Sequence, residues 1–556
     1  MTNKEMARAF QFLGELMELH GENPFKIRSY QNAYLTLRKL DRPLSDFSEA
    51  ELEALPGIGK AIVGKIRELV LYGKMEALEK YKAITPPGVG ELLLVQGLGP
   101  KKLRVIWKEL GVESIGELEY ALNENRLLEL KGFGEKTQEE LRRQLAFYQR
   151  NNSSFLYAAL EAPALELLNA VSAALPHAQV EWTGPLRRRS PVLNEISLLI
   201  GQVPPPLTEI NSLLSEGVLH EQAISGKTKE GYPVRIYCCD PSDFYKQQFR
   251  ITGSEAFLES FDRLEGAAAP ASDEAGFFKN TGLAWIEPER REEGTVLHPA
   301  AAPGLSPLVQ ERDIRGVIHA HSTYSDGLHP LAEMAQEAKA LGYEYLVISD
   351  HSKSAFYANG LSPERVLAQM EEIDRLNREL SPFRVFKGIE SDILADGSLD
   401  YPTEILDRFE VVIASIHSNL KMEEEKATRR LIKAIEQPQT RILGHPTGRL
   451  LLSRPGYPIR HREVIDACSA NGVAIELNAN PHRLDLDYTW IPYALEKGVP
   501  IAINPDAHSK SGIRDIRFGV LAARKGGLGA DHCLNAKDLA QFTAWVENRS
   551  ARLTAR

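Results

Sequence analysis

Short apolar runs rich in β-branched residues alternate with amphipathic stretches from about Ile314 to the end of the chain. These runs predict buried strands, and their starts recur at intervals of roughly thirty residues, about one βα unit each. The runs are IRGVIHAH, YEYLVISDH, FRVFKGIES, FEVVIASIH, TRILGHP, GVAIELNAN and PIAINPDAH. The alternation is typical of parallel β/α units and predicts a β/α barrel.

A helical pattern covers the first 150 or so residues. Within it lie three similar short loops, LPGIGK (Leu55–Lys60), VQGLGPKK (Val95–Lys102) and LKGFGEKT (Leu130–Thr137). Each loop has an apolar residue, then G-x-G, then the start of a helix that carries lysine. The repetition predicts that the same turn between helices occurs three times.

A mixed segment from about Ser153 to Ser260 contains strand-like runs such as EISLLI and PVRIYCC. Two Ala/Pro/Gly-rich stretches follow, EGAAAPASDEAG and HPAAAPGLSPL, which predict a linker or exposed loops.

Composition adds a few bounds. A chain of 556 residues is too long for one core, so several domains are expected. We expect a cytoplasmic protein, since no run of about 18 apolar residues is present and the start MTNKEMARAFQF lacks a signal-peptide layout. The four cysteines form no C-x-x-C pair, which disfavours a disulfide framework or a zinc knuckle. The net charge of −10 means that any contact with DNA must come from local patches or backbone-mediated motifs.

Nearly every predicted strand of the last segment ends in a potential metal ligand. In β/α barrels, reactive groups sit where strands give way to βα loops. Any one of these residues alone reads as an ordinary surface or core residue, but their recurrence at corresponding strand ends favours a metal site. The candidates are His319, His321, Asp326, His351, Glu390, His417, His445, Asp506 and His508.

The spacing of these residues has a physical meaning. Alternate side chains of a strand share a face, so His319 with His321, and Asp506 with His508, can aim at one centre. Nine nitrogen and oxygen donors are too many for one tetrahedral ion and suit two or three cations of the Zn²⁺, Mn²⁺ or Fe²⁺ type. An open site of this kind would lower the pKa of bound water and clamp a phosphoryl group. The sequence therefore predicts a metal-dependent phosphoesterase.

The segments HAHSTYSDG, SDHS, KGIES, SIHS, GHP and PDAH resemble the motif series of the PHP (polymerase and histidinol phosphatase) superfamily. The resemblance implies a distorted seven-stranded (β/α)7 barrel with a trinuclear site in which Glu390 bridges two ions and takes part in catalysis. Asp350 is a candidate catalytic or orienting carboxylate, with capping of the next helix as the alternative. Arg449 and Arg483 are candidates for phosphate contact, with surface ion pairs as the alternative.

The three G-x-G loops resemble helix-hairpin-helix motifs, in which glycines let backbone N–H groups approach a DNA phosphate. The alternative is that they are plain turns between helices. The candidate DNA-contacting residues are Gly57, Gly59, Lys60, Gly97, Gly99, Lys101, Gly132 and Gly134.

The stretch around the first of these loops, NPFKIRSYQNAYLTL…LPGIGKAIVGKIREL, further resembles the small N-terminal domain of DNA polymerase beta. That register implies that Lys65 matches a Schiff-base lysine for an abasic sugar, with Tyr30 and Lys26 as its neighbours. A phosphate contact is the alternative for Lys65, and Ala61 replaces another basic position of the family.

The middle segment resembles the palm of family X DNA polymerases, with departures. The family's G-S-x-R-R loop corresponds to Gly184-Pro185-Leu186-Arg187-Arg188, and TGSEAF resembles its thumb-side loop. The three catalytic carboxylates fall on Glu195, Ser197 and Arg235. Two-metal nucleotidyl transfer needs carboxylates that share both ions, so we predict that polymerase activity is lost.

Over nearly its full length the chain resembles bacterial family X DNA polymerases with a C-terminal PHP domain. The expected fold is multidomain: all-α helix-hairpin-helix domains over 1–85 and 86–150, an α+β nucleotidyltransferase-like palm and thumb over 151–300, and the α/β PHP barrel over 314–556. The expected function is DNA repair by a metal-dependent 3′-5′ exonuclease, and also an AP endonuclease. The expected substrate is DNA with a gap, a 3′ end or an abasic site, and we expect a monomer without a membrane partner. The alternatives are a small-molecule phosphomonoesterase of the histidinol-phosphatase type, a non-enzymatic DNA-binding adaptor, and a gap-filling polymerase.

Overall fold

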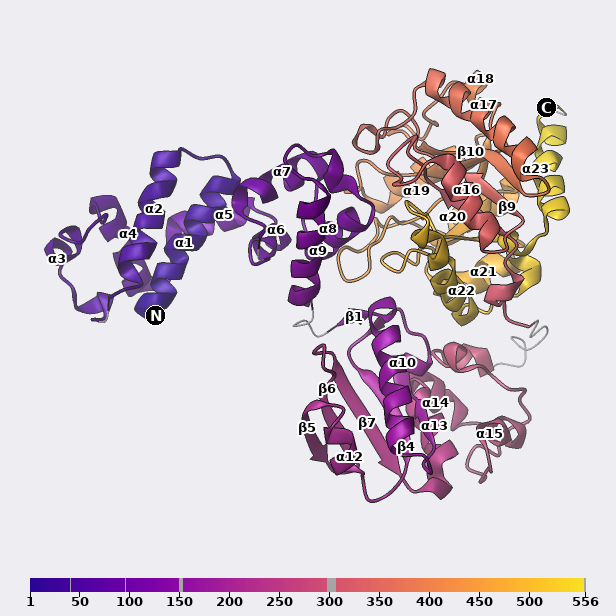
Figure 1. Cartoon of the computed structure of the whole chain (residues 1–556), viewed down its shortest axis with the longest axis horizontal. Coiled ribbons are helices and arrows are strands. Elements are labelled where there is room, and N and C mark those ends of the chain that lie inside the picture. Colours follow the sequence, from indigo (N-terminus) through magenta and orange to yellow (C-terminus); the bar gives the residue numbers. More distant parts are fainter. Residues whose placement is uncertain (41, 96, 150–153, 298–306, 555–556) are drawn as a thin grey trace. The chain divides into compact units, whose positions relative to one another are not determined.

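The computed structural model describes residues 1–40, 42–95, 97–149, 154–297 and 307–554, and it divides into two compact units, Met1–Tyr148 and Gln149–Arg556 (Figure 1). The expected fold class is confirmed in both. Among the described residues, no helix has the length and apolar character needed to cross a membrane.

The first unit is built from helices around one apolar core that includes Phe10, Leu52 and Ile106. Its helices are α1 (Asn3–Leu19), α2 (Pro24–Leu37), α3 (Glu49–Glu53), α4 (Lys60–Tyr72), α5 (Glu76–Ile84), α6 (Pro87–Leu92), α7 (Pro100–Leu110), α8 (Ile115–Asn123) and α9 (Glu135–Gln149).

The three G-x-G loops of this unit have one common backbone geometry. The apolar residue between the glycines is buried in each, and its N–H donates at 3.1 Å to the carbonyl three residues earlier. These bonds run from Ile58 to Leu55, from Leu98 to Val95 and from Phe133 to Leu130. The first glycine of each loop has a positive φ, a conformation that favours glycine, and the helix α4, α7 or α9 begins after the second. The three loops that are similar in sequence therefore also share one backbone conformation.

The second unit begins with a five-stranded sheet of order β2-β4-β7-β6-β5. Its strands are β2 (Val180–Trp182), β4 (Ile196–Gly201), β5 (Ser215–His220), β6 (Ala223–Lys227) and β7 (Pro233–Cys239). Strands β4 and β7 are parallel, and the other pairs are antiparallel. Helix α10 (Tyr157–Ala174) packs on this sheet, and α13 (Phe244–Thr252), α14 (Glu255–Phe261) and α15 (Glu274–Asn280) follow it. This is the predicted α+β palm and thumb.

The expectation of a linker or exposed loops after this sheet holds for most of one stretch. EGAAAPASDEAG runs from Glu265 to Gly276; residues 265–273 form turns with exposed or half-buried side chains, and only its end differs, because it forms the start of α15. Glu274 there is buried and forms ion pairs with Arg187 and Arg291, at 2.5 and 2.6 Å. Glu274 is buried there because Arg187 and Arg291 compensate its charge. These partners lie far from it in the sequence, so the composition of the stretch does not reveal them. The second stretch, HPAAAPGLSPL, lies mostly outside the described residues.

The barrel is a seven-stranded parallel sheet of order β14-β13-β12-β11-β10-β9-β8. All seven predicted strands are present: β8 (Gly316–Ala320), β9 (Tyr345–Ile348), β10 (Arg384–Asp392), β11 (Val411–Ser415), β12 (Thr440–Leu443), β13 (Ala474–Asn478) and β14 (Ile501–Asn504). Nearly every strand residue is buried, as expected for a parallel sheet covered on both faces. The intervening helices are α16 (Leu331–Ala340), α17 (Pro363–Leu380), α18 (Thr403–Leu406), α19 (Glu424–Ile435), α20 (His461–Asn471) and α21 (Ile491–Glu496), with α22 (Ile516–Lys525) and α23 (Leu539–Thr554) after β14.

The two edges of this sheet approach each other and nearly close the barrel. The N–H of His321 donates to the carbonyl of Ala507 at 2.9 Å, and the N–H of Ala507 donates to His319 at 3.2 Å. Both His319 and Asp506 have a positive φ, of 65° and 52°. Strained backbone of this kind is typical of functional sites and occurs here at two predicted ligands.

Candidate functional site

The nine predicted ligands converge at the carboxyl ends of the barrel strands. Glu390 is the centre of one half: its Oε1 lies 3.1 Å from His417 Nε2, 3.0 Å from His445 Nε2 and 3.4 Å from His319 Nε2, and its Oε2 lies 2.9 Å from His351 Nδ1. Glu390 is completely buried. One carboxylate that reaches four imidazoles is the arrangement expected of a bridging ligand.

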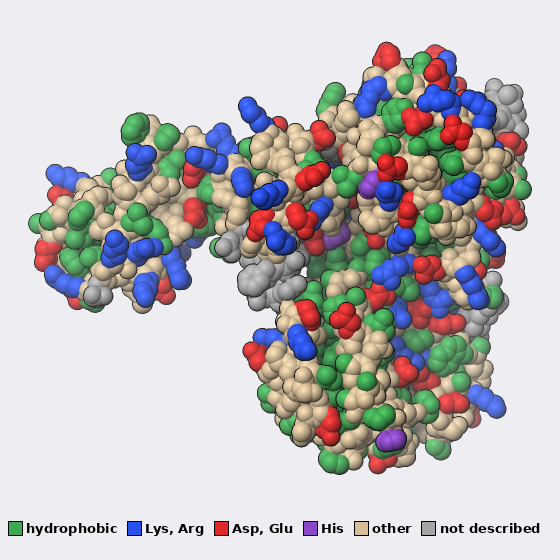
Figure 2. Space-filling model, in the orientation of Figure 1, with side chains coloured by type: hydrophobic (Ala, Val, Ile, Leu, Met, Phe, Trp, Pro, Cys, Tyr) green, Lys and Arg blue, Asp and Glu red, His purple; other side chains and the backbone are tan. Residues whose placement is uncertain are grey.

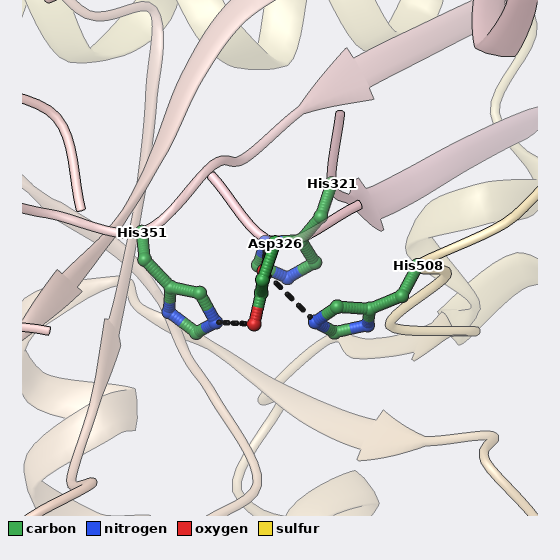
Figure 3. A group of neighbouring side chains, drawn as sticks. All are labelled: His321, Asp326, His351 and His508. Carbon is green, nitrogen blue, oxygen red and sulfur yellow. Dashed lines mark ion pairs between the residues drawn. The ribbon is translucent and has the colours of Figure 1, made fainter. Parts of the chain in front are cut away.

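Asp326 and Asp506 organise the other half. Asp326 Oδ1 lies 3.3 Å from His508 Nε2, and its Oδ2 lies 3.6 Å from His351 Nε2 (Figure 3). Asp506 Oδ1 lies 3.1 Å from His321 Nε2 and 3.4 Å from His319 Nε2. Figure 3 shows the rings of His321, His351 and His508 grouped around Asp326.

His319 and His321 come together in the structure, but not by the regular strand alternation that the sequence predicted. Simple alternation along a strand would put both on one face, but the pairing of β8 with β9 shifts register between Val317 and Ala320. His319 has left-handed backbone, and His321 follows the end of the strand. Both imidazoles lie within 3.4 Å of Asp506, as the prediction of one common centre requires. The irregular end of β8, and not regular alternation, places them there.

The electrostatics of the cluster suit cations. Burial opposes ionisation of Glu390, yet His417, His319 and His351 hold the pKa of its carboxyl well below the usual value. The pKa of Asp506 is held well below its usual value by His319 and His321 in the same way. Burial, with His508 and His351 nearby, lowers the pKa of His321 to about 3. Ionised carboxylates and the neutral imidazole of His321 are the protonation states in which these groups bind metal ions.

In spite of burial, Glu476 and Asp506 raise the pKa of His319 well above its usual value. Glu390 and Asp392 raise the pKa of His417 to about 10 in the same way. A cation that binds these two imidazoles therefore displaces a proton.

Several ligand atoms also lack hydrogen-bond partners within the described residues. His319 Nε2, His321 Nδ1, Asp326 Oδ2 and Glu390 Oε2 are buried and form no hydrogen bond there. Buried polar atoms are nearly always satisfied, so each exception requires an explanation, and a bound cation supplies one. Three overlapping groups have donor atoms within 4.8 Å of one another: His321–Asp326–His351–His508, His319–His321–Asp506 and His351–Glu390–His417. The residues present therefore fit a metal centre.

A second set of carboxylates holds the histidines, and the sequence interpretation missed it. His319 Nδ1 donates to Glu476 at 2.6 Å, and His417 Nδ1 donates to Asp392 at 2.6 Å. Glu476 also accepts from the N–H of His445 and from the side chains of Asn478 and Asn504. Such partners orient a ligand and fix its tautomer. A signal was available: Asp392 follows Glu390 by two positions, and Glu476 is a carboxylate inside an apolar strand.

Asp350 holds a ligand-bearing loop. Its carboxylate accepts from the N–H and Oγ of Ser322, at 2.8 and 2.7 Å, and from the N–H and Oγ of Ser325, at 3.1 and 2.5 Å. Gln369 donates to it at 2.6 Å. Burial raises the pKa of Asp350 in spite of these bonds. Ser322 and Ser325 lie between His321 and Asp326, so Asp350 holds in place the segment that joins these two predicted ligands.

The two candidate phosphate-contacting arginines lie in different environments. Arg483 is buried, and its Nε lies 4.0 Å from Asp506 Oδ2, beside the cluster. Arg449 forms an ion pair with Asp487 and donates to the carbonyls of Arg483 and Leu484. Arg449 therefore braces the loop that carries Arg483, and only Arg483 lies beside the predicted ligands.

The predicted remnant of a polymerase site also comes together. Ser197 on β4 pairs in register with Arg235 on β7, and Arg235 Nε lies 3.2 Å from Glu195 Oε2. A Cβ added to Gly184 would lie 3.7 Å from Ser197 Oγ, so the loop Gly184–Arg188 adjoins them. Arg187 pairs with Glu274, and Arg188 pairs with Glu292 at 3.0 Å. The cations of this loop are thus occupied by carboxylates of the chain itself.

Lys65 lies on α4 and is half-buried, and its neighbour in the expected register, Tyr30, is buried against Phe10. Lys26 lies 3.6 Å from Glu22. The hairpin lysines Lys60 and Lys101 are exposed.

Family models match most of the chain. A Helix-hairpin-helix domain matches residues 1–75, a SAM-like Helix-hairpin-helix tandem matches 89–146, and a PHP domain matches 318–480. Two curated relatives match less than half of the chain. A "Probable phosphatase" of Thermoanaerobacter sp. (strain X514) is 25% identical over 42% of this chain and 92% of its own length. Another, of Acetivibrio thermocellus, is 32% identical over 34% of this chain and 74% of its own.

A full-length relative also exists. The protein named "DNA polymerase/3'-5' exonuclease PolX" of Bacillus subtilis (strain 168) is 33% identical over 98% of this chain and 100% of its own length. Helix-hairpin-helix domains, palm and PHP barrel thus follow in one order over the full length, and the chain belongs to the PolX family.

Proposed function

We propose that this chain is a DNA-binding, metal-dependent phosphoesterase of DNA repair that removes nucleotides from 3′ ends in the 3′-5′ direction. One observation carries the proposal: nine predicted ligands, eight of them buried, converge in a chain that matches a named 3′-5′ exonuclease over 98% of its length. The same chemistry at an abasic site would make the chain an AP endonuclease as well. We take it to act as a monomer, since all nine ligands come from one chain.

The proposed cofactor is a set of two or three ions of Mn²⁺, Zn²⁺ or Fe²⁺. The ligands are all nitrogen and oxygen donors, which these ions accept. Such ions, when bound, activate water and stabilise the charge of a phosphoryl group. His319, His321, Asp326, His351, Glu390, His417, His445, Asp506 and His508 would hold them. Arg483, beside Asp506, would contact a phosphate oxygen, and Asp350 would keep the Ser322–Ser325 loop in place.

DNA binding is proposed to come from the hairpin loops. On the face shown in Figure 2, lysine and arginine side chains lie scattered over the helical unit among acidic and apolar ones. Phosphate contact by backbone N–H groups does not need a strongly basic surface. A Cβ added at Gly59, Gly99 or Gly134 would meet nothing within 4 Å, so the backbone is open to a close approach there.

This geometry gives a clean prediction for Gly99. Its φ of −72° is accessible to any residue, and its surroundings are open, so Gly99→Val should leave the folded state intact. The new side chain would keep a phosphate away from the start of α7. We expect DNA affinity to fall by about tenfold, comparable to the loss of one good charge-assisted hydrogen bond, with an unchanged melting temperature. Fluorescence anisotropy with labelled duplex measures the affinity.

The control variant is Gly64→Val. Gly64 also faces open space but lies inside α4, away from the loops. Equal affinities for the Gly99→Val variant and the unaltered chain would remove this loop from the DNA interface.

We propose that the palm holds DNA without polymerising it. Arg235 sits where a two-metal site needs a carboxylate, and its pairing with Glu195 leaves no shared acidic pair to bind Mg²⁺. Arg187 and Arg188, expected to face a triphosphate, are paired with Glu274 and Glu292. Lyase chemistry at Lys65 stays a prediction.

The phosphatase relatives support a second candidate, a phosphomonoesterase acting on a small molecule. They cover 42% and 34% of this chain, whereas this chain also carries helix-hairpin-helix domains over 1–75 and 89–146. The two functions separate when the purified chain with Mn²⁺ is given end-labelled gapped DNA or p-nitrophenyl phosphate.

Stepwise shortening from the 3′ end, abolished by a chelator, is the expected result. Faster turnover of the monoester with intact DNA would favour the phosphatase. Incorporation of dNTPs at the gap would contradict the proposal for the palm.

A further inference from the structure

Exposed apolar side chains of the barrel gather at its metal-bearing end. Among the described barrel residues, the large apolar side chains that are exposed are those of Leu328, Phe356, Leu367 and Leu452. Leu328 follows Asp326 by two positions, Phe356 follows His351 by five and Leu452 follows His445 by seven. Leu367 lies near the start of α17, directly after the loop of Phe356. The βα loops that carry ligands therefore also carry the exposed apolar groups.

Phe356 is the extreme case. Its side chain is 90% exposed, although Ala355 and Ala358 on either side of it are fully buried. Aromatic rings dominate core and interface energetics when they are buried, so an exposed ring beside a functional site indicates a contact surface.

The loop that carries Phe356 is anchored at several points. Leu361 donates its N–H to the carbonyl of the ligand His351 at 2.9 Å, and Gly360 donates to Ala355 at 3.1 Å. Asn359 Nδ2 donates at 3.4 Å to the carbonyl of Ser325, next to the ligand Asp326. The backbone that carries the ring is thus tied to His351 and to the neighbour of Asp326, while the ring itself faces water.

We propose that Phe356 is a stacking platform for an unpaired base at the 3′ end of the DNA strand that is cleaved. This inference rests on the proposed function and names the residue that would hold the unpaired base of a single-stranded or frayed 3′ end. Every base has a π-face that can stack on an aromatic ring without sequence preference. In a duplex these faces are covered by neighbouring base pairs, so a free platform selects bases that have left the stack. The exposed Lys353, three positions before Phe356, suits the phosphate backbone of such a strand.

The test is a series at one position. Phe356→Ala removes the ring, Phe356→Leu keeps an apolar side chain without a ring, and Phe356→Trp keeps an aromatic ring. On a single-stranded oligonucleotide with Mn²⁺, we expect kcat/KM to fall by about tenfold for Ala and Leu, with Trp close to the unaltered chain. A matched oligonucleotide whose last two nucleotides are abasic should be cleaved equally by all four proteins, since it offers no base to stack.

A second readout does not depend on catalysis. With chelator present, binding should quench the fluorescence of a 2-aminopurine at the 3′ terminus for the unaltered chain and the Trp variant, but not for the Ala and Leu variants. A 2-aminopurine near the 5′ end serves as the control.

Three results would overturn the proposal: equal quenching in all four proteins, equal loss on the abasic substrate, or full activity of the Leu variant. Full activity of the Leu variant would indicate that position 356 makes an apolar contact, for example with a protein partner, and does not stack on a base. Failure of the unaltered chain to cleave any DNA would refute the proposed function instead, and the quenching series would still report on the platform.

Discussion

A His319→Ala variant should lose essentially all metal-dependent DNA cleavage. His319 is fully buried and lies 3.4 Å from both Glu390 and Asp506, so its loss removes a donor shared by two halves of the cluster. Even partners outside the ligand set typically cost 10–100-fold when they are removed, so we expect a loss of more than about 100-fold for a ligand. Cleavage of labelled DNA with Mn²⁺ and metal content by mass spectrometry measure the effect.

The matched control is His532→Ala. His532 is exposed on the same barrel and pairs locally with Asp531. This variant should keep both its metal and its activity. Undiminished cleavage by His319→Ala would refute the assignment of the site.

The second large effect is expected for Glu476→Gln. Glu476 holds the Nδ1 proton of His319 and thereby leaves Nε2 free to bind a cation. It also receives the N–H of His445, so one carboxylate orients two ligands. We expect metal affinity to fall by about 10–100-fold. The concentration of Mn²⁺ that gives half-maximal cleavage should rise accordingly, and saturating Mn²⁺ should restore much of the rate.

Glu410→Gln separates this effect from a general loss of stability. Glu410 accepts hydrogen bonds from Arg384 and from the N–H of Lys387, next to the start of β11. Its replacement removes comparable contacts at the other end of the strands and should leave the Mn²⁺ dependence unaltered. An unaltered Mn²⁺ dependence in Glu476→Gln would show that Glu476 does not tune the ligands.

Phe356 and the pairing of Glu476 with His319 illustrate what the sequence could not predict. Phe356 stands in the segment SAFYANG, where no periodic pattern distinguishes buried from exposed positions. Only the structure shows that Ala355 and Ala358 are buried while the Phe356 ring faces water. Glu476 lies 157 positions from His319, and nothing in either local segment states that they meet. Contacts of this kind depend on how strands pack side by side, which local patterns do not encode.

The sequence by itself determined the seven strands, the three hairpin loops and the nine residues that converge at the end of the barrel. These features are local: the run of apolar residues defines a strand, its end marks the catalytic edge of a parallel sheet, and a G-x-G turn is a short-range backbone device. The ungapped register that placed Glu195, Ser197 and Arg235 at the polymerase positions is also local and stays a prediction, and the structure shows that the three residues lie close together.

Only the tertiary structure decided which partners these groups take. It assigned Arg449 to bracing the loop of Arg483, Asp350 to the Ser322–Ser325 segment and Glu274 to Arg187. It also replaced regular alternation at His319 by left-handed backbone. The physical reason is that buried charges and strained backbone persist only where distant groups compensate them, so they depend on neighbours that the chain brings close by folding.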